Sequence, residues 1–394
     1  MKLRYKYRIY PNKQQEQQMI SVGGSSRFVF NYFLKQNINQ YQIDKKFIWH
    51  FDMNKKLTHV KKQFTWLYDT YNAVLQSSLR DLDQSLKNIK HGAGFPKFKS
   101  KYTTPIKFKY PRFVSIVNNQ LRLPKIGDIK IVFDRDLPKF TGCTIYKTPR
   151  GWYASFVVDK EEIVLCNDIT NSVGIDVNSD YTALSTGELI TNLKPLKSKS
   201  HKIKQLQRQL ARKKKGSKNR IKSKIKLARL HDQIRCQRHY HIHQISSRIT
   251  KAYDLVSVET LKINEMRKNH YAAKAIQDVG WAMFITAIKY KSKLLGHHFV
   301  KISQWLPSSK TCSNCGEKKQ SLDLKDRQFV CDTCNLSIHR DINAAININN
   351  YGIQQWTRDH ARQLLSEAPV DVVSDLLTCW GEQSATSTKQ EILV

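Results

Sequence analysis

Acidic residues are scarce in this sequence: 32 Asp and Glu stand against 67 Lys and Arg in a chain of 394 residues. The net charge of +35 repels itself in a compact chain unless a polyanion neutralises it. A long apolar run is missing as well, because no stretch approaches the roughly 18 apolar residues that a membrane span requires. The shortage of acids therefore indicates nucleic acid as the partner, with a membrane surface as the second choice.

A disulfide framework and a secretory signal are also missing. Four of the eight cysteines form two Cys-x-x-Cys pairs. The others, Cys143, Cys166, Cys236 and Cys379, stand singly, which suits a reducing cytosol and one metal site. The N-terminal stretch MKLRYKYRIYPNK has no apolar h-region, and its alternation of basic and apolar residues predicts a β-strand. With 40% hydrophobic and 10% aromatic residues, the chain can form two or three folded domains.

The first half of the chain predicts a β-rich module that is interrupted by helices. A strand over residues 1–10 is followed by helical spacing from about 14 to 101, and then by short apolar runs between turn residues from 106 to 166. We expect the first strand to pair with the later ones, which makes the helical block an insertion. Residues 171–190 predict two further strands joined by a turn.

The longest charge run extends from Lys197 to Arg229 and contains fifteen Lys and Arg but no acid. Apolar residues recur within it at helical spacing, at Ile203, Leu206, Leu210, Ile221 and Ile225. This pattern predicts two amphipathic helices in a hairpin, with the apolar stripes inward and the lysines outward. A solvated helix face is the plain alternative. A face without acids forms no i,i+4 ion pairs and repels itself, so a polyanion is the better account. The candidate nucleic-acid contacts are Lys204, Arg208, Arg212, Lys213, Lys214, Lys215, Lys218, Arg220 and Lys222.

The last third of the chain predicts strands and helices in alternation. A β-branched strand covers 254–261, a helix covers about 278–296, and the strand HHFVKIS follows. The stretch HRDINAAININNYG predicts a short helix that stops at Gly352, and residues 351–394 predict a poorly ordered tail.

Cys312, Cys315, Cys331 and Cys334 have the spacing of a four-thiolate zinc site. The fifteen residues between the two pairs are expected to form a hairpin whose ends the metal joins. Because thiolates fill all four corners, no position is left for a catalytic water, and the zinc would be structural.

Three acids are candidates for a second metal centre. Asp176 follows an apolar strand, Glu259 ends the strand LVSV, and Asp341 stands where a helix begins. Each acid alone is more often a cap or a turn residue, and Asp341 would be an N-cap for the N–H groups of Asn343 and Ala344. Gathered together on a basic protein, the three carboxylates would hold Mg²⁺ in a two-metal phosphodiesterase. The residues alone leave both interpretations open.

The chain resembles the TnpB family, the RNA-guided endonucleases of insertion-sequence transposons, which are related to the compact CRISPR effectors. The resemblance covers nearly the whole chain. It is carried by the stretches YRIYPNKQQEQQM, SRFVFNYFL, LQSSLRDLDQSLKNIKHGAGFPKFKSK, GIDVNSDYTALSTGE, LARKKKGSKNRIKSKIKLARLHDQI, VSVETL, WLPSSKTCSNCG and HRDINAAININ.

The resemblance implies a multidomain α/β and β fold, built around an RNase H-like (RuvC) nuclease domain with a zinc-ribbon insert. The implied domains are a β-barrel-like wedge domain (1–22 and 103–166), a helical recognition lobe (23–102), the nuclease (167–305 and 339–350, with the basic hairpin 197–250), the zinc ribbon (306–338) and a tail (351–394).

The resemblance also implies an activity. Asp176, Glu259 and Asp341 would bind two Mg²⁺ ions, and one Zn²⁺ would stiffen the ribbon. The protein would cut double-stranded target DNA beside a short flanking motif, guided by an RNA encoded near its gene. Base pairing would supply most of the sequence discrimination. Its place would be the cytoplasm, at the nucleoid of a prokaryotic cell, with no membrane partner.

The sequence departs from the family pattern at Val177-Asn178, Thr260, Asn335 and His339, and none of these departures removes a metal ligand. Two other functions compete with the nuclease: a nuclease-inactive, RNA-guided repressor, and a transposase or accessory DNA-binding protein of transposition. A transposase would need a His-hydrophobe-His motif with a paired tyrosine, and HYHIH (239–243) lies inside a predicted helix. Because all three acids are present, the nuclease is preferred.

Overall fold

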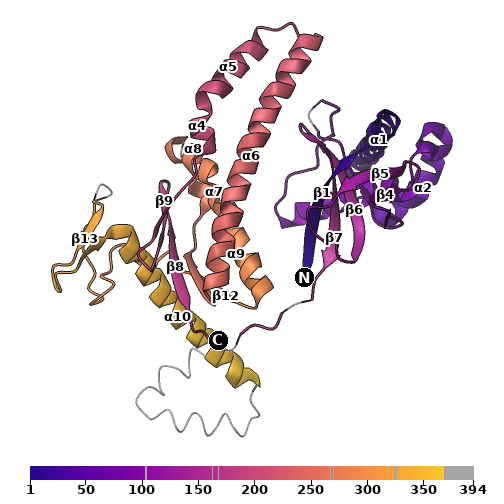
Figure 1. The fold of residues 1–394 in the computed structure, drawn as a ribbon. Helices are drawn as coiled ribbons and strands as arrows, with labels where there is room; N and C mark the ends of the chain where they lie inside the picture. The colour runs from indigo at the N-terminus through magenta and orange to yellow at the C-terminus, as the bar shows by residue number, and fades with distance from the viewer. Residues whose placement is uncertain are drawn as a thin grey trace. The chain divides into compact units, whose positions relative to one another are not determined.

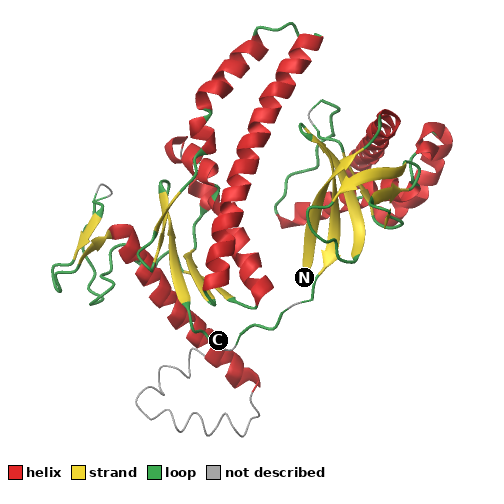
Figure 2. Ribbon diagram, viewed as in Figure 1, coloured by secondary structure: helices red, strands yellow, loops and turns green. Residues whose placement is uncertain are grey.

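A computed structural model of the chain describes residues 1–102, 104–161, 163–166, 168–266, 268, 270–323 and 326–367 (Figure 1). The chain forms two compact units, Met1–Glu161 with Lys215–Asp232, and Glu162–Lys214 with Gln233–Val394. Figure 2 distinguishes their helices and strands. Within the described ranges, no helix combines the length and the apolarity that crossing a membrane requires.

The first unit contains an antiparallel sheet of seven strands in the order β2-β6-β7-β1-β5-β4-β3. Its strands are β1 (Lys2–Tyr10), β2 (Lys107–Tyr110), β3 (Ser115–Val117), β4 (Gln120–Leu123), β5 (Gly127–Val132), β6 (Phe140–Thr148) and β7 (Gly151–Asp159). Strand β1 pairs with both β5 and β7, so the predicted pairing of the first strand with later ones is confirmed. The alternation in β1 explains its place, because Tyr7 and Ile9 are buried in the core whereas Arg8 points outward.

Three helices precede β2 and share a second core: α1 (Lys13–Asp44), α2 (His50–Gln63) and α3 (Asn72–Lys87), with the short turns η1 (Thr65–Asp69) and η2 (Asn88–His91). Helix α1 starts at a capping box in which Asn12 and Gln15 exchange hydrogen bonds of 2.8 and 3.0 Å. Its buried Phe33 and Leu34 pack against Leu79 and Leu82 of α3 in one apolar cluster. This block lies between β1 and β2 in the chain, as predicted.

The second unit is built on a five-stranded sheet in the order β10-β9-β8-β11-β12. Its strands are β8 (Ser172–Val177), β9 (Tyr181–Leu184), β10 (Leu189–Thr191), β11 (Leu255–Glu259) and β12 (His298–Ile302). Strands β8, β11 and β12 are parallel, and β9 and β10 join antiparallel at one edge. One face of the sheet packs against α6 (Lys218–Ala252) and α9 (Trp281–Leu295), where Val173 and Val256 belong to the same apolar cluster as Ile249 and Phe284.

Helix α10 (Arg340–Glu367) crosses the other face of this sheet (Figure 1). The close approach depends on two glycines. A Cβ on Gly174 would lie 2.1 Å from the Ala345 carbonyl oxygen, and a Cβ on Gly352 would lie 1.8 Å from Ser257 Oγ. The predicted helix stop at Gly352 is therefore wrong, because this glycine serves helix–sheet contact rather than helix termination. The predicted tail is also wrong from residue 351 to 367, which are helical, and its remainder, with Cys379, lies outside the described residues.

The basic segment forms α4 (Pro195–Ser198), α5 (Ser200–Ala211) and α6, with Gly216 at φ 86° in the connecting turn. Lys199 Nζ donates 2.7 Å to Gln237 Oε1 across the two arms, which agrees with the predicted hairpin. The predicted inward apolar stripe holds for the buried Ile203 but not for Ile221 and Ile225, which are 54% and 41% exposed. These two residues lie in the first turns of α6. Helices α7 (Ile263–Met266) and α8 (His270–Val279) complete the unit.

Candidate functional site

Asp176 and Glu259 stand at the carboxyl ends of neighbouring parallel strands. The register pairs Val258 with Ile175, so the two acids follow at the same level of the sheet. Because side chains alternate along a strand, Asp176 shares a face with Gly174, and Glu259 shares a face with Ser257. This is the face that α10 crosses. The sheet therefore directs both carboxylates toward the side on which α10 lies.

Asp341 lies in the first turn of α10, one helical turn before Ala345. Its Oδ2 accepts a 2.7 Å hydrogen bond from the hydroxyl of Tyr181 on β9, and its backbone N–H donates to His339 Nδ1 at 3.2 Å. The expectation that Asp341 caps the helix is wrong, because α10 begins one residue earlier, at Arg340. Asp341 is 7% exposed. Its carboxylate lies near the acids at the strand ends, because its charge raises the pKa of Asp176.

The three acids interact electrostatically. Burial and then the nearby charges of Asp341 and Glu259 raise the pKa of Asp176 to about 7, although a 3.2 Å hydrogen bond from Asn178 Nδ2 opposes the shift. Burial also raises the pKa of Glu259. Buried carboxylates that repel one another favour either a shared proton or a bound cation. The donor set consists of hard oxygens, which Mg²⁺ prefers.

The carboxylates are nevertheless not drawn together into a coordination sphere. Among the described residues, the four cysteines are the one gathered group of three or more metal-ligand side chains.

Tyr181 is a site residue that the sequence analysis missed. Its hydroxyl holds Asp341 and also lies 3.4 Å from His339 Nε2. Burial and the hydrogen bond to Asp341 raise its pKa to about 12, so the group remains a donor at neutral pH. A tyrosine in a short antiparallel strand carries no sequence signal of this role, because its partner is 160 positions away in the chain.

The four cysteines form a second site, at the ribbon. The Sγ atoms of Cys312 and Cys334 are 3.6 Å apart, and those of Cys315 and Cys331 are 3.5 Å apart. These separations fit the edges of a tetrahedron around a zinc ion with Zn–S bonds of about 2.3 Å. Hydrogen bonds from the Asn314 side chain and the Leu336 backbone lower the pKa of Cys334 to about 6, which favours the thiolate that a metal needs.

The hairpin is not where the sequence predicted it. Strands β13 (Gln328–Val330) and β14 (Ser337–His339) pair with each other and enclose the second cysteine pair. An isolated bridge between Thr311 and Lys318 encloses the first pair. Each knuckle thus has its own turn, and in the second one the backbone N–H groups of Thr333 and Cys334 donate to the Cys331 sulfur.

Two buried asparagines of α10 fasten the first knuckle. Asn343 accepts a hydrogen bond of 2.9 Å from the Ser313 N–H and donates one of 2.7 Å to the Thr311 carbonyl. Asn347 donates hydrogen bonds of 2.8 and 2.7 Å to the carbonyls of Ser308 and Thr311. The cysteine centre is therefore tied to the same helix turn that carries Asp341.

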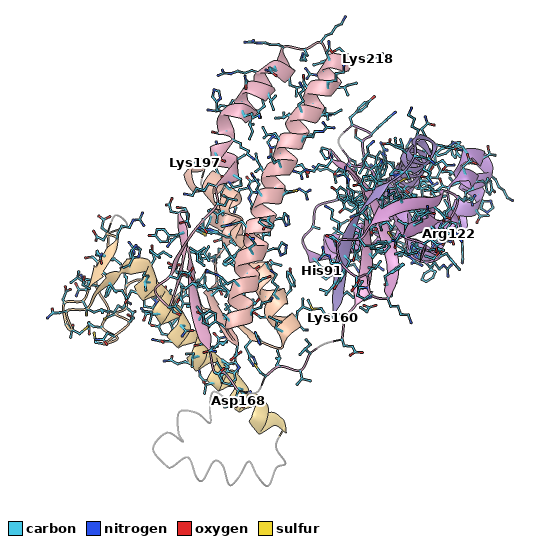
Figure 3. All side chains as sticks on the ribbon, in the orientation of Figure 1. His91, Arg122, Lys160, Asp168, Lys197 and Lys218 are labelled. Atoms are coloured by element: carbon cyan, nitrogen blue, oxygen red, sulfur yellow. The ribbon has the colours of Figure 1, made fainter. Side chains whose placement is uncertain are left out.

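The predicted nucleic-acid contacts lie along the basic hairpin, where side chains project from both arms between Lys197 and Lys218 (Figure 3). Of the nine candidates, Lys213 and Arg220 are half-buried and the others are exposed. The hairpin includes the histidines of HYHIH, which lie within α6 as predicted.

Three family models match parts of the chain. Residues 1–46 match the family described as "Helix-turn-helix domain", residues 155–270 match the IS605 OrfB family described as "Probable transposase", and residues 281–348 match "Cas12f1-like, TNB domain". The last match spans all four cysteines. Within the first match, the structure has one continuous helix, α1, after the strand β1.

Two relatives are similar to the chain along most of their length. A candidate RNA-guided DNA endonuclease of Streptomyces pristinaespiralis is 31% identical over 363 residues, which cover 90% of this chain and 90% of that protein. The candidate RNA-guided DNA endonuclease InsQ of Escherichia coli (strain K12) is 28% identical over 369 residues, which cover 87% of this chain and 90% of InsQ.

Two solved structures overlap more weakly. A cryo-EM structure of a Cas12f1-sgRNA-target DNA complex has a TM-score of 0.35 at 18% identity and covers 89% of this chain and 99% of that one. A CRISPR-Cas12f ternary complex has a TM-score of 0.37 at 17% identity and covers 86% of this chain and 82% of that one. Overlaps of this size carry no argument about the fold.

Proposed function

This chain belongs to the TnpB/IS605 family, and from that membership we propose that it is an RNA-guided, Mg²⁺-dependent DNA endonuclease. The observation that carries the proposal is the coupling of three acids from separate parts of the chain. Asp176 and Glu259 end adjacent strands, and the charge of Asp341, at the start of α10, raises the pKa of Asp176. A very basic protein with such a cluster is suited to bind nucleic acid and hydrolyse its phosphodiester bonds.

The sheet topology supports an RNase H-like, RuvC-type nuclease domain. Numbered within the domain, its strands have the order 3-2-1-4-5, with the first, fourth and fifth parallel. The three acids then occupy the ends of the first and fourth strands and the start of the helix across them. We assign the domain to residues 167–305 and 339–350, with the ribbon, residues 306–338, inserted before Asp341.

The three carboxylates would hold two Mg²⁺ ions, which when bound supply a Lewis acid for the attacking water and for the leaving 3′ oxygen. The chain's own contribution is to fix the ligands. Tyr181 orients Asp341 through its hydroxyl, Asn178 donates to Asp176, and the carbonyl of Asn178 is held by Asn192 Nδ2 at 2.8 Å and by Trp281 Nε1 at 3.2 Å. The four cysteines would bind one structural Zn²⁺ that keeps the first turn of α10 in place.

Guide RNA and double-stranded DNA are the partners that this function requires. The relatives are named as candidate RNA-guided enzymes, and this chain matches each of them over 90% of its length. The net charge of +35 suits a protein that binds nucleic acid. We assign the β-sheet module (1–22 and 103–166) as a wedge domain and residues 23–102 as a recognition lobe, which together would hold the RNA and read a short motif beside the target.

The test is to express the chain with its native downstream DNA, purify it, sequence the co-purifying RNA, and incubate the complex with a matched double-stranded target and Mg²⁺. We expect the wild type to cut and Asp176→Ala to bind the target without cutting. A bound RNA and a bound target without cleavage by the wild type would make the protein a guided repressor. Absence of any bound RNA would refute the guided function altogether.

A further inference from the structure

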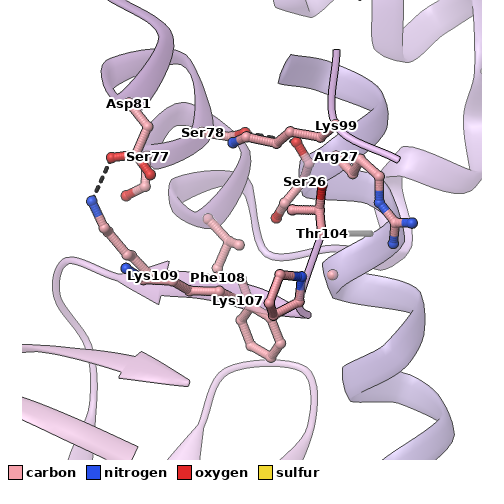
Figure 4. A pocket seen from close by; sticks show the side chains of 13 residues that line it. Ser26, Arg27, Ser77, Ser78, Asp81, Lys99, Thr104, Lys107, Phe108 and Lys109 are labelled. Atoms are coloured by element: carbon pink, nitrogen blue, oxygen red, sulfur yellow. Dashed lines mark hydrogen bonds and ion pairs between the residues drawn. The ribbon is translucent and has the colours of Figure 1, made fainter. Parts of the chain in front are cut away.

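A pocket of about 270 Å³ lies in the first unit, between α1, α3 and the chain segment that leads into β2. Figure 4 shows it from close by, with Arg27 of α1, Asp81 of α3, Lys99 of the segment, and Lys107 and Lys109 of β2 among its walls. The acids and cysteines of the functional site are far away in the sequence, and none of them lines this pocket.

The pocket walls carry four cations and one carboxylate. Asp81 is already committed, because it forms an ion pair with Lys109. Arg27, Lys99 and Lys107 therefore leave a positive surplus at the pocket. Lys99 is half-buried, with its Nζ 3.4 Å from the centre of the Phe30 ring. Burial, opposed by Asp81 and assisted by Lys109 and Lys107, lowers its pKa to about 8. An anion in the pocket would relieve this unfavourable concentration of charge.

A hydroxyl at the pocket wall lacks a partner. Ser26 is 7% exposed, and its Oγ makes no hydrogen bond to any described residue. Its neighbour Ser78 is satisfied, since Ser78 Oγ donates 2.6 Å to the Ser26 carbonyl. A buried unpaired hydroxyl is costly, and a bound water or ion is one of the ways in which native proteins satisfy such a group. An anionic ligand oxygen could accept a hydrogen bond from Ser26 Oγ while the positive charge of Lys99 balances its negative charge.

The walls are held in position before any ligand arrives. Asn31 of α1 donates 2.9 Å to the Lys99 carbonyl and accepts 2.8 Å from the Lys99 N–H, so the backbone of this lysine is fixed to the helix. Gly23 lets α1 pass close to the segment, because a Cβ there would lie 2.6 Å from Ile106 Cγ2. Preorganised donors of this kind lower the entropic cost of binding.

We propose that this pocket binds one phosphodiester group of a nucleic-acid backbone, with Lys99, Arg27 and Lys107 supplying charge and Ser26 a hydrogen bond. The assignment rests on the proposed function, because it presumes that the chain binds nucleic acid. Phosphates fit the chemistry better than carboxylates do, since several cations and a hydroxyl line one small pocket. Guide RNA and target DNA share this group, and the experiment separates them.

The experiment uses the full chain with its guide RNA and compares Lys99→Gln and Ser26→Ala with Lys90→Gln, an exposed lysine of the same unit. Affinity for the RNA, and separately the affinity of the assembled complex for matched DNA, are measured over a range of salt concentrations. We expect each pocket variant to weaken binding about tenfold in one of the two measurements. Lys99→Gln should also reduce the salt slope by about 0.7 for single-stranded RNA or about 0.9 for duplex DNA.

The arm that responds identifies the source of the phosphate. Ser26→Ala also provides an internal check on folding: it removes an unsatisfied hydroxyl, so the melting temperature without nucleic acid should not fall while affinity does. Wild-type binding that neither pocket variant alters would overturn the pocket proposal and leave the guided nuclease intact. A wild-type chain that binds neither RNA nor DNA would overturn both.

Discussion

The Tyr181 hydroxyl donates a 2.7 Å hydrogen bond to Oδ2 of Asp341, joining strand β9 of the five-stranded sheet to the helix α10 that crosses it. The bond connects two chain segments that the ribbon and the basic hairpin separate in sequence. It orients the carboxylate of a residue in the first turn of α10. Tyr181 is thus a positioning residue for the acid cluster.

Replacing Tyr181 with Phe should weaken metal binding without affecting guide RNA. Loss of a group that orients a metal ligand typically lowers affinity or activity about 10- to 100-fold. We expect Tyr181→Phe to raise the Mg²⁺ concentration for half-maximal cleavage by about that factor. Calorimetric titration of the protein with Mn²⁺ supplies a readout that does not depend on cleavage.

Tyr290→Phe is the matched control, because its hydroxyl lies 3.4 Å from His243 Nδ1 rather than beside an acid. An unchanged metal dependence in Tyr181→Phe would mean that this hydrogen bond only fastens the helix to the sheet.

Replacing Asp176 with Asn should stabilise the chain in buffer without magnesium. Burial and the charges of Asp341 and Glu259 raise the pKa of Asp176 from an ordinary value near 4 to about 7. The folded state therefore binds a proton more tightly than the unfolded state, and wild-type stability from this group falls as pH rises through that interval. Asparagine resembles the protonated acid, so its advantage should grow from pH 4 to 7 and reach about 1–3 kcal/mol at pH 8.

Chemical denaturation at pH 5 and pH 8 measures this difference. Asp180→Asn is the control, because a side-chain hydrogen bond from Lys194 lowers the pKa of Asp180 and its replacement should not stabilise. A loss of stability in Asp176→Asn at pH 8 would show that the carboxylate is satisfied without a cation.

Loss of the ribbon metal should impair cleavage through α10 rather than through RNA binding. Asn343 and Asn347 tie this helix to the first knuckle, and Asp341 lies in the same helical turn as Asn343. We expect Cys334→Ser to increase amide hydrogen exchange over residues 308–313 and to reduce cleavage at least tenfold while RNA affinity stays within twofold. Cys166→Ser, which leaves the cluster intact, should change neither.

A chelator titration of the wild type tests the same prediction, with zinc release followed by a colorimetric dye. Cleavage that persists after one equivalent of zinc has been released would show that the acid cluster functions without the ribbon metal.

The tip of the basic hairpin should contribute to affinity for every sequence alike. Replacing Lys213, Lys214 and Lys215 with Glu should weaken nucleic-acid binding and lower the salt slope by up to about 2 for single-stranded RNA. Replacement of the same residues with Gln should lower the slope by a similar amount, because the same phosphate contacts are lost, but should weaken binding less, because neutralisation adds no repulsion. Equal slopes in all three proteins would assign these lysines to solvent.

Local patterns in the sequence were sufficient to place both acids at strand ends and to single out the four cysteines that the structure gathers. Asp176 and Glu259 lie at the ends of short apolar runs, and the cysteine spacing is specific because four thiolates must meet at one point to hold a zinc ion. Alternation likewise predicted that the first strand joins the later sheet, which β1 confirms.

What the sequence did not reveal depends on partners distant in the chain. Gly352 looks like a helix stop in any local window, and only the position of Ser257 beneath it explains the continuing helix. Ile221 follows a helical stripe, yet it is 54% exposed in the structure. The contacts of Tyr181 and Asn343 are of the same kind, because each is a single polar side chain whose meaning comes from a remote carbonyl or carboxylate.

The order of the acids along the chain has a consequence during synthesis. Asp176 and Glu259 leave the ribosome before Asp341, and the ribbon separates the last two. Under the proposed function, a chain that ends between residues 306 and 340, through a premature stop or through proteolysis at the ribbon, retains the β-sheet module, the helical block and the basic hairpin but lacks α10 and with it the third carboxylate. Incomplete products would therefore occupy targets without breaking DNA, and only finished molecules would cut.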